Sequence, residues 1–253
     1  MTDKSEPPPR PSGVVDITGP LREGAWHYPP PYFAPRVRSL PSPDWSAAEI
    51  HQQAVDMPMQ SGTYLETAAH AYPERELVED LPLARTAMLP SVCVGVDAQP
   101  GSGIDAARLK RSIDRVCGTR SLDGAGLLVA TGWSAHWFDD DFLTAGPFFT
   151  PDAIEHVLEL RVSLLGADLP RFDDPQQPTG HLRRFFATPT LMLAPLYRLE
   201  YIVGSAGWLT AAPLRLAGVC ASPVRAIWIP AGSSELRSLT PASSGAHRGM
   251  CGS

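Results

Sequence analysis

The stretch that decides the fold is Gly126-Leu-Leu-Val-Ala-Thr131, an unbroken apolar run in the middle of the chain. Ser91-Val-Cys-Val-Gly-Val96 has the same character. Short continuous apolar runs of this kind are typical of strands that are buried on both faces of a sheet, although periodicity alone does not exclude a buried helix. Similar runs predict further strands at residues 162–167, 190–194 and 224–229.

Two helices are expected among these strands. From Asp105 onward, apolar residues recur at helical spacing up to Gly118, and a glycine there is typical of a helix end. Thr150-Pro151 places a capping residue before a proline, which predicts the start of a second helix. Strands and helices therefore alternate in the middle of the chain, whereas the first third is irregular. This pattern indicates the α/β or α+β class with a mixed sheet.

The composition fits one large domain. The chain has 253 residues, of which 43% are hydrophobic and 19% are charged, and these proportions are ordinary for a globular core. We expect a single domain over residues 14–230. A Pro-rich tail at residues 1–13 and a Gly/Ser-rich tail at residues 231–253 are expected to flank it.

Charge and hydropathy exclude several classes of partner. The net charge is -6 and no basic patch is present, so neither nucleic acid nor an anionic membrane is an expected partner. The apolar runs are too short for a helix that spans a bilayer, and the N-terminal stretch has no apolar signal core. None of the four cysteines forms a Cys-x-x-Cys pair, which is typical of reduced structural cysteines in a cytoplasmic protein.

The chemistry is concentrated in Met59-Gln-Ser-Gly-Thr-Tyr-Leu-Glu-Thr-Ala-Ala-His70. If this stretch is extended as far as Glu66, then Gln60, Tyr64 and Glu66 share one face. His70 follows Glu66 by four residues and would lie beside that carboxylate in a helical turn. A carboxylate can fix the imidazole tautomer and raise its basicity, which makes an acid–base unit. On spacing alone, a polar strand edge with a satisfied histidine is the better interpretation.

The same stretch resembles the metal-binding motif of the cyclase family, which includes bacterial kynurenine formamidase and isatin hydrolase. That motif reads His-x-Gly-Thr-His-x-Asp-x-Pro-x-His. Three positions match and one is conservatively replaced: Gly62, Thr63, His70 and Glu66. Gln60 and Tyr64 stand where the motif has histidines. Further blocks resemble the family in the same order: 15–29, 80–83, 127–133, 149–153, 165–170, 212–218 and 222–226.

The resemblance implies a swivelling β/β/α fold and a homodimer or larger homo-oligomer. It also implies one or two zinc or manganese ions that serve the hydrolysis of a small cyclic or formylated amide. The family's last motif histidine, here His70, would be the acid–base residue. A later His and a later Glu complete the family site, and they fall at His181 and Ala194 of this chain.

The replaced ligands argue against the family's two-metal site. Catalytic zinc needs imidazole or carboxylate ligands, and neither an amide, a phenol nor a methyl group supplies one. No metal cofactor is therefore expected. If zinc or manganese binds, it would take Glu66, His70 and His181.

What remains is a predicted small-molecule pocket. Its polar substrate-binding residues would be Gln60, Thr63 and His181, and its aromatic walls would come from Trp26, Tyr28, Phe33 and Trp133. Asp168 also matches a family position, and its expected role is to cap the end of a strand.

Three functions are compatible with these residues. In the first, a metal-independent enzyme acts on a small, largely apolar carbonyl compound. His70 and Glu66 supply acid–base chemistry for cyclisation, dehydration, isomerisation or lactone or amide opening, while Tyr64 and Gln60 bind the carbonyl. In the second, one divalent metal supports hydrolysis of an amide or lactone. In the third, the chain binds a small molecule without catalysis.

Overall fold

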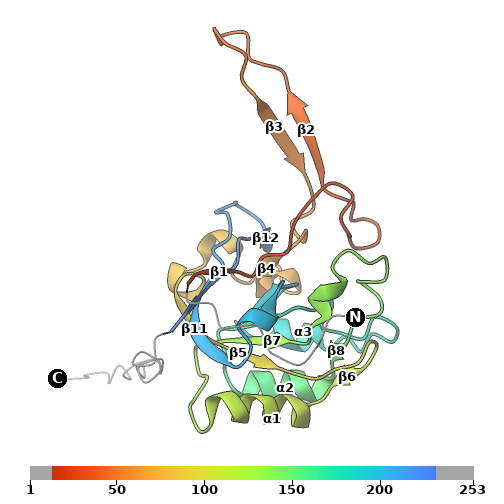
Figure 1. Cartoon of the computed structure of the whole chain (residues 1–253), viewed down its shortest axis with the longest axis vertical. Coiled ribbons are helices and arrows are strands. Elements are labelled where there is room, and N and C mark those ends of the chain that lie inside the picture. The colour runs from red at the N-terminus through yellow and green to blue at the C-terminus, as the bar shows by residue number, and fades with distance from the viewer. Residues whose placement is uncertain (1–12, 232–253) are drawn as a thin grey trace, which may run out of the picture.

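The computed structural model describes residues 13–231, and the terminal tails expected from the sequence lie almost wholly outside this range. Four neighbouring parallel strands form the centre of a nine-stranded sheet (Figure 1). These strands are β5 (Leu89–Gly95), β7 (Gly126–Ala130), β9 (Leu164–Ala167) and β10 (Leu191–Ala194). Four of the five strands expected from apolar runs are thus confirmed as the centre of the sheet.

Antiparallel strands extend the sheet on both sides, in the order β1-β13-β11-β5-β7-β9-β10-β4-β12. The outer strands are β1 (Val15–Asp16), β4 (Tyr64–Glu66), β11 (Ser205–Thr210), β12 (Ala221–Pro223) and β13 (Ile227–Pro230). The fifth expected strand begins only at Ile227, because Val224 instead forms an isolated bridge with Pro213. The combination of parallel and antiparallel pairs confirms the mixed sheet.

Alternation along β7 explains why its run is wholly apolar. Leu127 and Val129 pack into one hydrophobic cluster, whereas Leu128 and Ala130 pack into a second one. Side chains in a strand alternate between faces, so the two clusters lie on opposite faces of the sheet. Both faces of the centre are therefore core, as the continuous apolar run predicts.

The main helices lie together on one face of the sheet (Figure 1). They are α1 (Ala106–Cys117), α2 (Pro151–Glu159) and the short α3 (Leu182–Phe186). Asp105 caps α1, since its carboxylate accepts the backbone N–H of Arg108 at 2.7 Å. Both expected helix starts are confirmed. None of the helices within residues 13–231 has the length and apolar character needed to cross a bilayer.

Several short elements connect these layers. The 3₁₀ turns are η1 (Ala68–His70), η2 (Val78–Asp80), η3 (Leu83–Arg85), η4 (Trp133–His136) and η5 (Leu199–Tyr201). The paired strands β6 (Gly103–Ile104) and β8 (Phe148–Phe149) precede α1 and α2. Asp168, just after β9, accepts the backbone N–H groups of Thr131 at 2.9 Å and Gly132 at 2.8 Å, so it holds the turn after β7 as expected.

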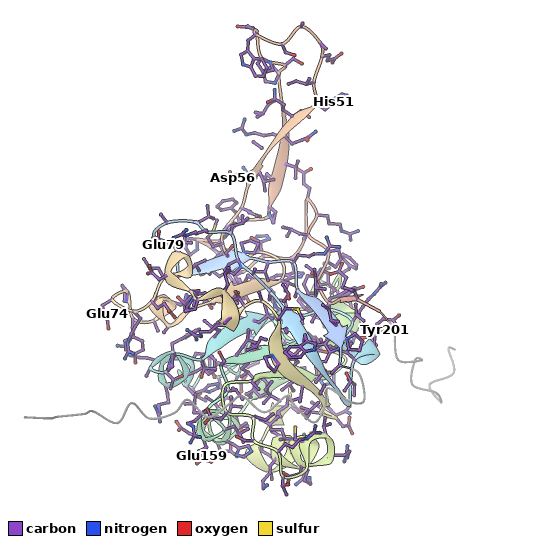
Figure 2. The ribbon with its side chains drawn as sticks, turned by 90° about the vertical axis from the view of Figure 1, so that its left-hand side faces the viewer. His51, Asp56, Glu74, Glu79, Glu159 and Tyr201 are labelled. Carbon is purple, nitrogen blue, oxygen red and sulfur yellow. The ribbon has the colours of Figure 1, made fainter. Side chains whose placement is uncertain are left out.

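A two-stranded arm projects from the body. Strands β2 (Arg36–Leu40) and β3 (Gln52–Asp56) pair only with each other within the described chain (Figures 1 and 2). Their tip carries Trp45, of which 82% is exposed. The sequence predicted only an irregular segment here, because neither strand shows a regular apolar alternation.

Candidate active site

Strand β4 contains Tyr64 and Glu66 of the Met59–His70 stretch and is part of the large sheet. It lies between β10 and β12, where Glu66 is opposite Met192 on one side and Ala221 on the other. Gly62 has a φ of +62°, so the chain turns before β4. The expectation of one extended segment from Gln60 to Glu66 was therefore wrong in its first half. Tyr64 and Glu66 still share a face, as strand periodicity requires.

The predicted acid–base pair is present. After β4, the hydroxyl oxygen of Thr67 accepts the N–H of Ala69 and starts the short turn η1. This turn brings Nδ1 of His70 to 2.8 Å from Oε1 of Glu66. Gln60 donates from Nε2 to the same carboxylate oxygen at 3.0 Å. The Glu66 side chain is only 2% exposed, whereas that of His70 is 40% exposed and open to a ligand.

Cys220 joins this pair from a distant part of the chain. The N–H of Thr67 donates to the carbonyl oxygen of Cys220 at 2.9 Å, which aligns the segment before β12 with the end of β4. Donor atoms of Glu66, His70 and Cys220 all lie within 4.8 Å of one another. The Cys220 side chain and the Glu66 carboxylate raise the pKa of His70 to about 10, against a smaller opposing effect of burial. No pattern in the sequence indicates this contact. Cys220 is a free thiol, as expected, and its place beside His70 is a finding of the structure.

Two tyrosine hydroxyls form the opposite part of the site. The hydroxyl oxygens of Tyr64 and Tyr28 lie 3.0 Å apart, and Tyr28 donates to the carbonyl oxygen of Pro170 at 2.5 Å. The Tyr28 proton is used in that bond, so the Tyr64 hydroxyl is the donor within the pair. Burial raises the pKa of both phenols, and both therefore remain neutral donors.

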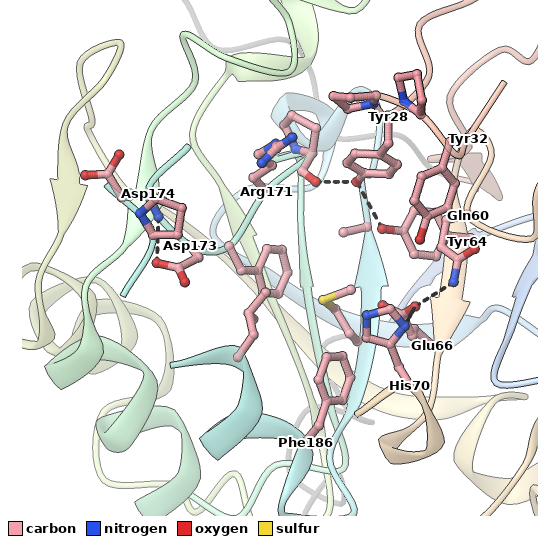
Figure 3. A pocket seen from close by; sticks show the side chains of 18 residues that line it. Tyr28, Tyr32, Gln60, Tyr64, Glu66, His70, Arg171, Asp173, Asp174 and Phe186 are labelled. Carbon is pink, nitrogen blue, oxygen red and sulfur yellow. Dashed lines mark hydrogen bonds and ion pairs between the residues drawn. The ribbon is translucent and has the colours of Figure 1, made fainter. Parts of the chain in front are cut away.

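These groups line one cavity of about 350 Å³, hereafter the His70 cavity (Figure 3). Its polar wall contains Gln60, Tyr64, Glu66, His70 and Arg171. Its apolar wall includes Pro29, Pro30, Phe172, Leu182, Phe186 and Met192. A concave, largely apolar space with a few convergent polar groups is the usual form of a small-molecule site.

Of the expected substrate-binding residues, Gln60 and Tyr28 line the His70 cavity and the others do not. Trp133 is buried, and its indole N–H donates to the carbonyl oxygen of Phe142 at 3.0 Å. Trp26 packs against Trp137 and Phe142 beside a different hollow. Phe33 is half-buried outside the cavity lining. Trp26 and Trp133 contribute to packing, so of the expected aromatic wall only Tyr28 lines the cavity.

Thr63 and His181 are also structural. The Thr63 hydroxyl donates to the carbonyl oxygen of Pro195 at 2.6 Å and accepts the N–H of Gly19 at 2.9 Å. The Nδ1 atom of His181 lies 2.6 Å from the Thr179 hydroxyl, and its Nε2 lies 3.2 Å from the carbonyl oxygen of Phe172. Both ring nitrogens are thus occupied, so neither a substrate role nor a metal role remains for His181.

The donor set fits at most one metal ion. Gln60, Tyr64 and Ala194, which occupy the family's ligand positions, do line the His70 cavity but supply no strong ligand. Within residues 13–231, one carboxylate, one imidazole and one thiol converge at Glu66, His70 and Cys220. Oxygen, nitrogen and sulfur donors of this kind suit a single zinc ion. Cys220 therefore replaces His181 in the expected alternative ligand set.

Comparison with known proteins agrees with the resemblance seen in the sequence. A family model described as "Putative cyclase" matches residues 15–174. An isatin hydrolase bound to the product analogue thioisatinate superposes with a TM-score of 0.75 at 21% identity, over 86% of this chain and 92% of that one. Isatin hydrolase A from Ralstonia solanacearum superposes with a TM-score of 0.73 at 20% identity, over 86% of this chain and 92% of that one.

A third structure, a predicted metal-dependent hydrolase from Bacillus stearothermophilus, gives a TM-score of 0.66 at 21% identity, over 85% of this chain and 97% of that one. Among curated proteins, no sequence matches the chain significantly. At these identities the structural matches establish the fold, and the family model extends over more than half of the chain.

Proposed function

The chain belongs to the cyclase family, and on that premise we propose that it is an enzyme acting on a small, largely apolar carbonyl compound. The reaction is opening of a lactam, lactone or formyl amide, or the reverse ring closure with loss of water. The observation that carries this proposal is the 2.8 Å contact of His70 with Glu66 on the wall of the His70 cavity. No metal is required for this chemistry.

The proposed steps use only side chains of the His70 cavity. Glu66 accepts the Nδ1–H of His70 and so fixes the imidazole, which leaves Nε2 to exchange a proton with the substrate. As water adds to the carbonyl carbon, His70 donates its Nε2 proton to the nitrogen or oxygen that leaves. The imidazole then takes a proton from the added water. The Tyr64 hydroxyl turns its single proton from Tyr28 to the carbonyl oxygen as negative charge develops there.

A second candidate is a single-metal hydrolase, and the convergence of Cys220 with Glu66 and His70 favours it. Those three residues would hold one zinc ion. When bound, zinc polarises a carbonyl and lowers the pKa of a coordinated water. Zinc content and sensitivity to chelators separate the two candidates.

The test is turnover of a panel of small aromatic lactams, lactones and N-formyl amides, followed by mass spectrometry. We expect one class to react, and the variant His70→Ala to lose roughly 10²–10⁴-fold in kcat. His136→Ala is the matched control, because His136 also contacts a carboxylate, Asp139 at 2.7 Å, but lies outside the His70 cavity. Full activity of His70→Ala would refute the proposal. Binding without turnover of any compound would indicate a non-catalytic binder.

We also propose that the chain forms a homodimer through the β2–β3 arm. An isolated two-stranded hairpin is marginally stable in water, and this one exposes Val37, Trp45 and Val55. In Figure 2, His51 and Asp56 mark the arm as it extends away from the body. In a two-fold dimer, the arm of each subunit packs on the other subunit, so both subunits use the same surface for the interface.

A further inference from the structure

Arg171 is a cation on the wall of the His70 cavity, and it forms no ion pair with any residue from 13 to 231. It follows Pro170, whose carbonyl oxygen accepts the Tyr28 hydroxyl. Its guanidinium carbon lies 5.8 Å from the centroid of the Tyr28 ring. Its Nε is buried and donates to no atom of residues 13–231. Figure 3 shows Arg171 on the Tyr28 side of the cavity, across from His70.

The carboxylates on the same wall are already engaged elsewhere. Asp173 accepts the N–H groups of Thr179 at 3.0 Å and Gly180 at 2.8 Å. Asp174 accepts the N–H of Gln176 at 2.8 Å. Glu66 is engaged by His70 and Gln60. None of these acids forms an ion pair with Arg171 in the described part of the chain.

The buried Nε–H of Arg171 has lost its hydration without gaining an acceptor, which is unfavourable. A ligand that brings an anion into the cavity removes that cost. The planar guanidinium matches a carboxylate through two parallel hydrogen bonds. A single guanidinium balances the one negative charge of a carboxylate but not the nearly double charge of a phosphate, so a carboxylate is the better fit.

We propose that Arg171 is a carboxylate-binding subsite of the His70 cavity. The inference rests on the proposed function for the reacting carbonyl, and it adds the substrate class. The substrate then carries a carboxylate that Arg171 binds and, on the same apolar body, a separate carbonyl that His70 and Tyr64 reach. Tyr28 lies between the two ends, since it contacts both Arg171 and Tyr64.

The experiment measures binding by calorimetry and thermal shift for pairs of arylalkanoic acids and their neutral amides, for example 3-phenylpropanoate and 3-phenylpropanamide. We expect the acid to bind about tenfold or more tightly than its amide, the discrimination typical of a charge-assisted pair. Arg171→Gln removes that difference, and Arg171→Lys restores part of it. Arg111→Gln, a change on the exposed face of α1, leaves the difference intact.

The same measurements on His70→Ala separate this inference from the proposed function, because that variant is expected to keep the preference for acids while losing turnover. Arg171→Gln is expected to melt no lower than the unchanged protein, since it removes an uncompensated charge. A lower melting temperature together with an unchanged acid preference would mean a structural role and would overturn the proposal. Equal binding of acids and amides, or no binding across the panel, would overturn it as well.

Discussion

The Nδ1 atom of His70 lies 2.8 Å from Oε1 of Glu66, and the His70 side chain is 40% exposed whereas that of Glu66 is 2% exposed. Glu66 is buried at the end of β4 and receives a second hydrogen bond from Gln60. His70 faces the His70 cavity. The buried carboxylate holds the exposed imidazole in place, so His70 can exchange a proton with a ligand without a change of side-chain position.

Glu66→Gln tests the orienting role of the carboxylate. The change keeps the size of the side chain but removes the charge that holds the His70 proton. We expect kcat to fall by about 10²-fold or more, with a smaller change in KM. Glu159→Gln is the control, since Glu159 contacts His156 at 3.6 Å on the surface. Equal kcat values for Glu66→Gln and the control would count against the acid–base pair.

Tyr64→Phe tests the proposed donor to the carbonyl oxygen. Phenylalanine keeps the packing of the ring and deletes the hydroxyl that contacts Tyr28. We expect a loss of about 10²-fold in kcat, as for removal of one donor to a developing oxyanion. Tyr201→Phe, on the exposed turn η5, is expected to behave as the unchanged protein. A loss confined to KM would show that Tyr64 binds the substrate but does not favour its transition state.

Removal of divalent metal is predicted to leave turnover intact, because the proposed steps use protein side chains alone. The measurement compares kcat and zinc content before and after dialysis against a chelator. Stoichiometric zinc that disappears together with activity would support the single-metal candidate. In that case Cys220→Ser is expected to lower zinc content, since it replaces the thiol donor near Glu66 and His70.

The stability of the chain is predicted to depend on Asp168 between about pH 4 and pH 6. Burial raises the pKa of this carboxyl from 3.8 to about 6, although Thr131 and Gly132 donate to it. The folded state therefore holds the proton more tightly than the unfolded state. The contribution of Asp168 to the free energy of unfolding is fully present below about pH 4. It falls by up to about 3 kcal/mol as the pH rises to about 6.

Denaturant unfolding of the unchanged protein and of Asp168→Asn checks this prediction. The asparagine does not titrate, so the difference between the two unfolding free energies isolates the carboxyl. That difference is expected to change by up to about 3 kcal/mol, to the disadvantage of the unchanged protein, as the pH rises from about 4 to 6. A difference that stays constant with pH would contradict it.

Loss of apolar side chains from the arm is predicted to dissociate the proposed homodimer. The double variant Trp45→Ser with Val55→Ser removes the exposed apolar groups of β3 and of the arm tip. Light scattering of this variant should give the monomer mass, while the unchanged protein gives twice that mass. Leu83→Ser is the matched control, because Leu83 is 72% exposed on the body. A monomeric unchanged protein would exclude the dimer.

The sequence predicted the centre of the fold because the residues of β7 themselves form an apolar run that indicates a buried strand. Leu127, Leu128 and Val129 are all apolar, as expected of a strand that is covered on both faces. The contact of Glu66 with His70 was expected from a helical turn, but it forms where strand β4 ends and the 3₁₀ turn η1 follows, so the spacing indicated the contact and not its geometry. The arm was not predictable, because its strands pair with each other and bury little apolar surface.

The amino-acid sequence by itself determined the mixed sheet, the starts of the main helices, the family and the contact of Glu66 with His70. Each of these depends on neighbours within a few residues or on ordered motifs. Only the tertiary structure placed Cys220 beside His70 and left the Nε of Arg171 without an acceptor among residues 13–231. It also moved His181 and Trp133 out of the site. Such contacts join segments far apart in the chain, and they arise only when packing of the sheet fixes which segments meet.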